Sequence, residues 1–408
     1  MTSRLSSALS ATFFSNVLVG TLNLSVQIIL ARSLGIEVIA DYAKIVAVSQ
    51  FFLLFTSFGL NHALIGVGYS IRGFYNLVYL TAIQLSLIAA VWAIVAVYFF
   101  VNYPSEFLHL AIPASLYVIG AVALIPAHSL NAGLEAKLNY QKISLMRLAS
   151  FGAGAVASLA ALTVTSSVLA IVIRDVTNGM TFLALSFILF RGTLRCRIDA
   201  KLAKRILSFS RQLWLIRGSS EGASRINALL LGALLNNFEF GIYFQMRSLV
   251  DGLLTFFLVP IQSVLFSYFR MKREAINFRF LAAILFPVAC LLTTISAIFF
   301  HFFGEVILET ALGKHWLPGT VTLVPLAMYA VAIIYFEVLV SMAQASGNIW
   351  PVLVARISWI SAVLLLVPPL TVWATLNGAA WAAMFSAWIM LAVGATLLLP
   401  RLQRKSLG

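Results

Sequence analysis

Three charged residues in one apolar segment, 208–233, have the types and spacing to bind an anion. Arg217, Glu221 and Arg225 follow one another at four-residue steps and therefore share one face of a helix. Glu221 can neutralise only one of the two arginines. A charge at the bilayer centre costs about 2.5–3.5 kcal/mol unless it meets water or a partner. The spacing therefore favours a functional cationic site over a helix that pairs its own charges while Arg217 reaches the membrane surface.

Two further charge pairs lie in later apolar segments. Arg247 and Asp251 are four residues apart on one predicted helix, so they can neutralise each other, and we favour this structural role. Glu337 and Arg356 each lie about 9 Å inside the cytoplasmic ends of neighbouring antiparallel segments, by helical rise. We therefore expect that these two residues can pair across the interface between their helices.

A polar stripe follows one face of the first apolar segment, 11–31. Its members have the spacing of one helix side, and they are Thr12, Asn16, Gly20, Asn23 and Gln27. The stripe either lines an aqueous cavity or forms hydrogen bonds to neighbouring helices within the membrane. Both interpretations stay open at this point.

Arg174 and Asp175 stand next to each other in a later segment. Adjacent helical residues point about 100° apart, so we expect that these two cannot form one surface pair and that each needs a partner elsewhere. The residues predicted to line a polar cavity are Asn16, Asn23, Gln27 and Arg174.

Common enzyme and metal sites are missing from the sequence. The five histidines lack metal-ligand spacing. The sequence also contains no phosphate-binding glycine loop, no nucleophile elbow and no pair of carboxylates placed for acid and base catalysis. We therefore predict that the chain is not an enzyme and has no catalytic residue, no metal and no cofactor.

The elements that position these residues are membrane-spanning helices. Of the 408 residues, 62% are hydrophobic and only 10% are charged, whereas a soluble chain carries about 25% charged residues. The apolar segments are each about long enough to span a bilayer. They lie at 11–31, 41–63, 77–101, 107–130, 146–165, 168–190, 208–233, 240–268, 280–302, 320–343, 350–373 and 377–399. This pattern predicts an all-α integral membrane protein with about twelve transmembrane helices.

Lysine and arginine positions predict the orientation of the chain. Most of the 27 basic residues lie in the segments that are cytoplasmic when the N-terminus is inside, so both termini are expected in the cytoplasm. The net charge of +14 is spread over these loops rather than over one face, so we expect no nucleic-acid partner.

The longest basic stretch divides the chain into two halves of six spans. We expect an N-terminal lobe at 1–190, a cytoplasmic connector at 191–207, a C-terminal lobe at 208–399 and a cytoplasmic tail at 400–408. In the first half, Tyr42 lies eight residues after Leu34, which Gly35 follows directly. In the second half, Tyr243 lies at the same offset after Leu235, with Gly241 between them. This similarity suggests an internal parallel repeat, although chance similarity between membrane helices is the alternative.

Several short motifs occur in an order typical of one transporter superfamily. They are Asn16, Leu30 to Gly35 with Tyr42, Phe58 to Leu60, Phe303 to Glu305 and Ala345 to Asn348. Together they resemble the polysaccharide-lipid flippases of the multidrug, oligosaccharidyl-lipid and polysaccharide exporter superfamily, with the O-antigen branch nearest. The chain departs from the family at Gln212 to Trp214, where a proline is frequent, and at Asn227, where an acidic residue is frequent.

The resemblance implies two six-helix lobes around a central cavity. It also implies that an undecaprenyl-diphosphate-linked oligosaccharide moves outward across a bacterial inner membrane by alternating access. Arginine's planar donors suit phosphate oxygens, so the expected diphosphate-binding residues are Arg217, Arg225, Arg247 and Arg356. The amides of the first segment would face the glycan. Expected partners are the lipid-linked substrate, membrane lipids and other polysaccharide assembly proteins.

Two other functions remain open. A drug or cation antiporter of the same superfamily would use Glu221, Asp251 or Glu337 for ion coupling, but nearby arginines would repel a cationic substrate. A membrane glycan polymerase or ligase would need a large outer loop with charged catalytic residues. The longest outer segment, roughly 303–319, offers few such residues.

Overall fold

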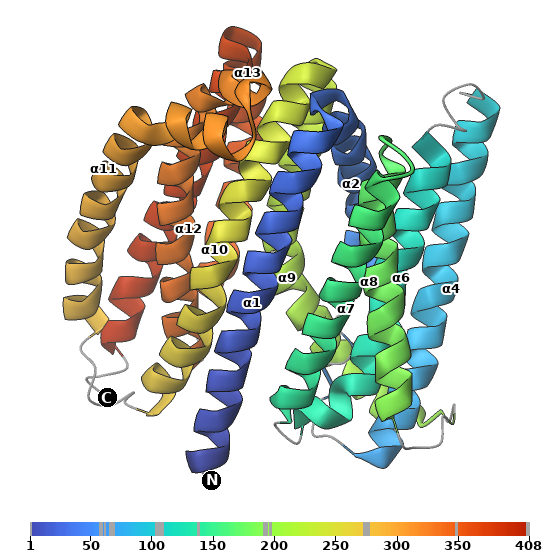
Figure 1. Cartoon of the computed structure of the whole chain (residues 1–408). Helices are drawn as coiled ribbons and strands as arrows, with labels where there is room; N and C mark the ends of the chain where they lie inside the picture. Colours follow the sequence, from blue (N-terminus) through green and yellow to red (C-terminus); the bar gives the residue numbers. More distant parts are fainter. Residues whose placement is uncertain are drawn as a thin grey trace. The chain divides into compact units, whose positions relative to one another are not determined.

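The structure is a computed structural model, and its described residues are helical almost throughout (Figure 1). It describes residues 2–56, 60, 63–64, 70–102, 110–136, 139–190, 195, 198–271, 278–346 and 350–404. The side chains of Asn16 and Arg217, and those of 255–285, lie outside this description. The helices are α1 (Thr2–Leu34), α2 (Ile36–Thr56), α4 (Ile71–Asn102), α6 (Ile112–Ala136), α7 (Tyr140–Leu162), α8 (Leu169–Leu189), α9 (Ala200–Leu234), α10 (Asn237–Met271), α11 (Phe278–Ala311), the short 3-10 helix η2 (Lys314–Gly319), α12 (Thr320–Ser346) and α13 (Trp350–Arg404).

Each of the twelve expected apolar segments falls on a helix, which confirms the predicted all-α membrane class. α13 contains the last two segments. They are separated at Ala374 and Thr375, where the backbone leaves helical geometry. Thr375 has a φ of 44°, in a region that residues other than glycine seldom adopt. Among the described residues, eight helices are long and apolar enough to cross a membrane, with α13 counted once.

The chain packs as two units. Unit 1 comprises Met1–Val26 and Lys44–Gly218, and unit 2 comprises Gln27–Ala43 and Ser219–Gly408. Both α1 and α9 contribute residues to each unit. The lobe and connector boundaries expected from the basic stretch at 191–207 stay a prediction.

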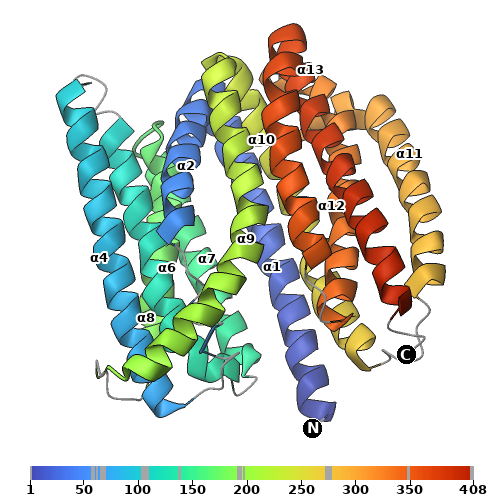
Figure 2. The same ribbon diagram turned by 180° about the vertical axis from the view of Figure 1, so that it is seen from behind.

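Unit 1 is held together by close helix packing around α8. Helices α6, α7 and α8 lie side by side in both ribbon views (Figures 1 and 2), and α8 contacts both of the others. Gly120 of α6 and Gly179 of α8 meet so closely that a Cβ atom added to Gly179 would lie 2.0 Å from the Gly120 carbonyl oxygen. Gly154 of α7 also lies close to α8, where an added Cβ atom would be 2.7 Å from the Arg174 carbonyl oxygen. Small residues thus let the helix backbones approach, as in other membrane proteins.

Unit 2 is built around α12, which contacts α10, α11 and α13. Most of the membrane-crossing part of α12 is buried, which explains why this helix is apolar on nearly every side. Gly394 of α13 leaves room for the ring of Phe336 in α12, whose nearest atom would lie 2.9 Å from an added Cβ atom. This packing positions the charged residues of α10, α12 and α13 toward one another.

The two similar sequence passages contact each other within unit 2. Gly241 of α10 lies against Ile36 and Ala40 of α2, and an added Cβ atom would be 2.5 Å from the Ile36 carbonyl oxygen. The rings of Tyr42 and Phe244 meet edge to face with centroids 6.0 Å apart. Among these contacts, the one between Gly241 and Ala40 joins positions that correspond when Leu34 is aligned with Leu235, and the repeat itself stays a prediction.

Candidate functional site

A cavity of about 240 Å³ in unit 2 gathers charged residues from α9, α10 and α12. Its charged lining residues are Glu221, Arg225, Arg247, Asp251 and Glu337. Tyr329, Phe336 and Trp359 contribute aromatic surface to the same cavity. Four-residue steps bring Glu221 and Arg225 to one side of α9, and Arg247 and Asp251 to one side of α10. The structure thus brings five of the predicted site residues together.

Arg247 and Asp251 form the ion pair expected from their spacing. The Arg247 Nε donates to both carboxylate oxygens of Asp251, at 3.1 Å to Oδ1 and 3.0 Å to Oδ2. The guanidinium carbon lies 3.6 Å from the centroid of the Tyr329 ring, which is a close cation–π contact. The arginine side chain is only 12% exposed, whereas that of Asp251 is 47% exposed. The guanidinium is therefore held in place, and its carboxylate partner is accessible.

Arg356 and Glu337 pair across the α12–α13 interface, as their depths in the two segments predicted. The Arg356 Nη2 lies 3.3 Å from the Glu337 Oε1, with the side chains 7% and 13% exposed. The guanidinium carbon also lies 5.9 Å from the Phe336 ring centroid. Glu337 lines the cavity and Arg356 does not, so this arginine is committed to a buried contact.

Arg225 differs from the other two arginines. It lines the cavity half-buried, and none of the ion pairs among the described residues includes Arg225 or Glu221. Glu221 is exposed and lies one helical turn before Arg225. The side chain of Arg217 lies outside the described residues, so its place beside the other two stays a prediction.

Among the described residues, three carboxylates match the three arginines at and beside the cavity. The carboxylates of Glu221, Asp251 and Glu337 accompany the guanidinium groups of Arg225, Arg247 and Arg356. Arg225 is thus the described cation of this cavity whose charge is not already engaged by a carboxylate. An anion that enters the cavity meets Arg225 without first having to break an ion pair.

Sequence reasoning missed the tyrosines that surround Arg247. Tyr329 lies under the guanidinium, and the buried Tyr243 accepts a hydrogen bond from the Asn227 Nδ2 at 3.2 Å. No spacing rule joins Tyr329 of α12 to Arg247 of α10, because the two helices are distant in sequence. Asn227 and Tyr243 could have been suspected as polar groups within apolar segments.

The polar stripe of α1 is described only in part. Asn23 and Gln27 are half-buried, and the side chain of Asn16 lies outside the described residues. The Gln27 Oε1 is buried without a hydrogen-bond partner in the described structure. Whether the stripe faces a cavity or neighbouring helices stays open.

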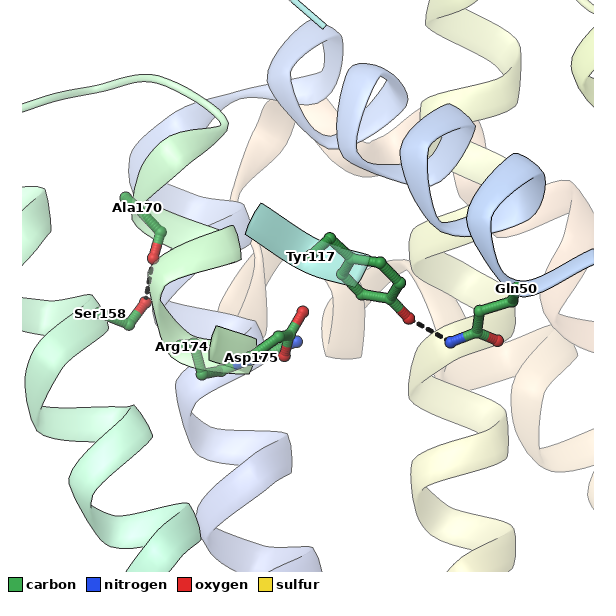
Figure 3. Close-up of polar contacts among 6 residues, drawn as sticks. All are labelled: Gln50, Tyr117, Ser158, Ala170, Arg174 and Asp175. Atoms are coloured by element: carbon green, nitrogen blue, oxygen red, sulfur yellow. Dashed lines mark hydrogen bonds and ion pairs between the residues drawn. The ribbon is translucent and has the colours of Figure 1, made fainter. Parts of the chain in front are cut away.

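The expectation that Arg174 and Asp175 cannot pair is wrong. The Arg174 Nε lies 3.0 Å from the Asp175 Oδ1, and Figure 3 shows the two side chains turned toward each other. Their Cβ atoms point apart, but the arginine side chain is long enough to curve around the helix to its neighbour. The role of Arg174 in lining a cavity stays a prediction.

Other polar contacts of unit 1 lie near this pair (Figure 3). The Ser158 hydroxyl donates to the carbonyl oxygen of Ala170 at 2.7 Å, which ties α7 to α8. The Gln50 amide donates to the Tyr117 hydroxyl between α2 and α6. These contacts satisfy polar groups inside an apolar unit, which is the usual function of such bonds in membranes.

Comparisons with known proteins place the chain in a functional context. A family model described as polysaccharide biosynthesis protein matches residues 29–321, more than half of the chain. No curated protein matches the sequence.

Solved membrane transporters share the fold. The lipid II flippase MurJ, in an inward closed conformation, aligns with a TM-score of 0.69 at 12% identity, covering 97% of this chain and 89% of that chain. An inward-facing multidrug resistance MATE family transporter of the MOP superfamily aligns with a TM-score of 0.64 at 14% identity, covering 95% and 96%. The eukaryotic MATE transporter AtDTX14 aligns at 0.62 and 12% identity, covering 99% and 98%. At these identities the comparisons show a shared fold, which is the fold that the resemblance implied, and the similar structures are transporters.

Proposed function

We propose that this chain, which belongs to the polysaccharide biosynthesis protein family, is a lipid-linked oligosaccharide flippase. It moves an undecaprenyl-diphosphate-linked O-antigen or related repeat unit from the cytoplasmic to the outer leaflet of a bacterial inner membrane, by alternating access. Both termini are cytoplasmic. Its partners are the lipid-linked substrate, membrane lipids and other polysaccharide assembly proteins.

The main support for this proposal is that Arg225 lines the cavity outside the ion pairs of the described residues. A diphosphate that crosses a low-dielectric interior needs a fixed cation, and the planar guanidinium suits phosphate oxygens. Arg225 lines the cavity of unit 2 outside every ion pair of the described residues. Arg247 and Arg356 already hold carboxylates, so Arg225 has the charge to offer first.

The fold and the family support the same proposal. A lipid II flippase has this fold, and the family is defined by polysaccharide biosynthesis. In the proposed arrangement the lobes at 1–190 and 208–399 alternate access around a central cavity. The amides of Asn16, Asn23 and Gln27 face the glycan together with Arg174, and the lipid tail stays in the bilayer.

A drug or cation antiporter is the second candidate. MATE transporters share the fold, and the cavity is lined by Glu221, Asp251 and Glu337, which are residues that can exchange a proton or cation. Two of these carboxylates are engaged by arginines, which lowers their availability to a cationic substrate. We therefore rank the antiporter below the flippase.

Depletion of the protein in its host tests the proposed function. We expect loss of surface polymer and accumulation of lipid-linked repeat units in the cytoplasmic leaflet of the inner membrane. Accumulation in the outer leaflet would instead indicate a polymerase or ligase. Normal polymer with altered drug tolerance would favour the antiporter.

Single-residue variants test the role of Arg225. Arg225→Gln should reduce glycan export at normal membrane levels of the protein, because the uncommitted cation is lost. Arg211→Gln is the matched control, since Arg211 is an exposed arginine of the same helix that does not line the cavity. Arg217→Gln belongs in the same series. Normal export in both the Arg217 and Arg225 variants would contradict the diphosphate role.

A further inference from the structure

We propose that Asp251 is an exchangeable anion that holds Arg247 until a phosphate group takes its place. The Asp251 carboxylate accepts hydrogen bonds from the Arg247 guanidinium, and the substrate phosphate displaces this carboxylate. This inference rests on the proposed function, because it assigns Arg247 as a second contact of the same lipid-linked diphosphate.

The geometry of the pair makes exchange possible. Asp251 accepts from the Arg247 Nε through both oxygens, at 3.1 and 3.0 Å. Carboxylate and phosphate oxygens accept hydrogen bonds from guanidinium donors in similar geometry. A phosphate oxygen can therefore replace the carboxylate on the same Nε donor without requiring Arg247 to move.

The two partners differ in their freedom to move. Arg247 is 12% exposed, and its guanidinium carbon lies over the Tyr329 ring, 3.6 Å from the ring centroid. Asp251 is 47% exposed at the cavity and has room to turn away. The arginine is therefore the fixed partner and the aspartate the mobile one.

Exchange also keeps an anion beside Arg247 at all times, so that its buried charge is not left uncompensated. A guanidinium left without an anion in an apolar interior is strongly unfavourable, so an empty cavity needs a substitute for the substrate. Asp251 supplies this substitute from the next turn of α10. Arg225, which lines the same cavity without an ion pair among the described residues, then offers the second cation of a diphosphate site.

The Glu337–Arg356 pair shows by contrast which pair can exchange. Its two side chains are 13% and 7% exposed, so even the Glu337 carboxylate, which borders the cavity, is largely enclosed. Displacement of Glu337 would require rearrangement at the α12–α13 interface. Among the described pairs at this cavity, Arg247–Asp251 is the one that combines a fixed cation with an accessible carboxylate.

The test measures pyrophosphate binding by the purified full chain in lipid nanodiscs. Asp251→Asn should bind inorganic pyrophosphate about ten-fold more tightly than the unchanged protein, because the internal competitor has lost its charge. The double variant Asp251→Asn with Arg247→Gln should lose this gain. Glu309→Gln is the control, since it removes the carboxylate of the exposed Lys314–Glu309 pair, which does not line this cavity, and it should leave affinity unchanged.

Unchanged or weaker affinity in folded Asp251→Asn would overturn the inference, as would absence of pyrophosphate binding in every protein of the series. Asp251→Ser provides the same reading if the asparagine variant does not fold. The outcome is separable from that of the proposed function. Tighter pyrophosphate binding in Asp251→Asn, with normal export after depletion, would support anion exchange while rejecting the flippase.

Discussion

Each unit of the molecule contains an arginine–aspartate pair on a single helix, and the two pairs differ in the exposure of the carboxylate. Arg174 and Arg247 are equally buried, but Asp175 is 22% exposed and Asp251 is 47% exposed. The pair of unit 1 lies near other polar contacts (Figure 3), whereas Asp251 lines a cavity. The same two residue types therefore form a largely buried pair in one unit, and in the other unit a pair whose carboxylate lines the cavity where we propose an anion site.

The largest expected effect comes from a third pair, in which both partners are buried. Glu337→Gln leaves the Arg356 guanidinium without its carboxylate in a buried position, so we expect a loss of about 3–5 kcal/mol in the free energy of unfolding. Thermal unfolding in detergent, followed by tryptophan fluorescence, measures it. The double variant Glu337→Gln with Arg356→Met should recover much of the loss, because an apolar replacement needs no partner. Unchanged stability in the single variant would contradict the assignment.

Loss of the aspartate should lower the free energy of unfolding more in the Arg174–Asp175 pair than in the Arg247–Asp251 pair, because Asp175 is the less exposed of the two. Asp175→Asn removes the charged acceptor of a buried arginine and should cost about 1.5–3 kcal/mol. Asp251→Asn should cost less than about 1 kcal/mol, because its carboxylate is half exposed at the cavity. The same unfolding measurement compares them directly. Equal losses would show that exposure of the carboxylate does not distinguish the two units.

Helix packing in unit 1 allows a further test. In Gly179→Ala the new Cβ atom would lie 2.0 Å from the Gly120 carbonyl oxygen, so α6 and α8 must move apart. We expect a loss of about 1–3 kcal/mol in stability. Gly152→Ala is the control, because an added Cβ atom there meets nothing within 4 Å. A loss in the control as large as that at Gly179 would argue against close packing as the cause.

The smallest effect is expected at the Lys314–Glu309 pair of unit 2. Its nitrogen and oxygen are 3.7 Å apart and the side chains are 82% and 47% exposed. Glu309→Gln should therefore change the free energy of unfolding by less than about 1 kcal/mol. A larger change would mean that accessible carboxylates contribute more than the comparison assumes, including Asp251.

The sequence predicted the fold better than it predicted the site. Long apolar segments identify membrane helices because the bilayer core requires them, so each expected segment matches a helix. The pairing of Glu337 with Arg356 followed from their similar depth in adjacent antiparallel segments. Residues within one helix, or in consecutive helices, obey such spacing rules.

Contacts that depend on side-chain length or on distant helices were not predictable in this way. The directions of the Cβ atoms predict that Arg174 and Asp175 do not pair, but the arginine side chain is long enough to reach its neighbour. Tyr329 beneath Arg247 joins α12 to α10, and no periodicity links them. The division of α1 near Val26 and Gln27 between two units also has no sequence signal, because the helix continues through it.

The Glu337–Arg356 pair has a consequence for the biosynthesis of the protein. For a helix that enters the bilayer alone, one buried charge raises the free energy of insertion by about 2.5–3.5 kcal/mol. Glu337 and Arg356 lie in helices that follow each other in the chain and neutralise each other once both are present. Insertion of α12 and the first half of α13 together, as one helical hairpin, is therefore favoured over insertion one helix at a time.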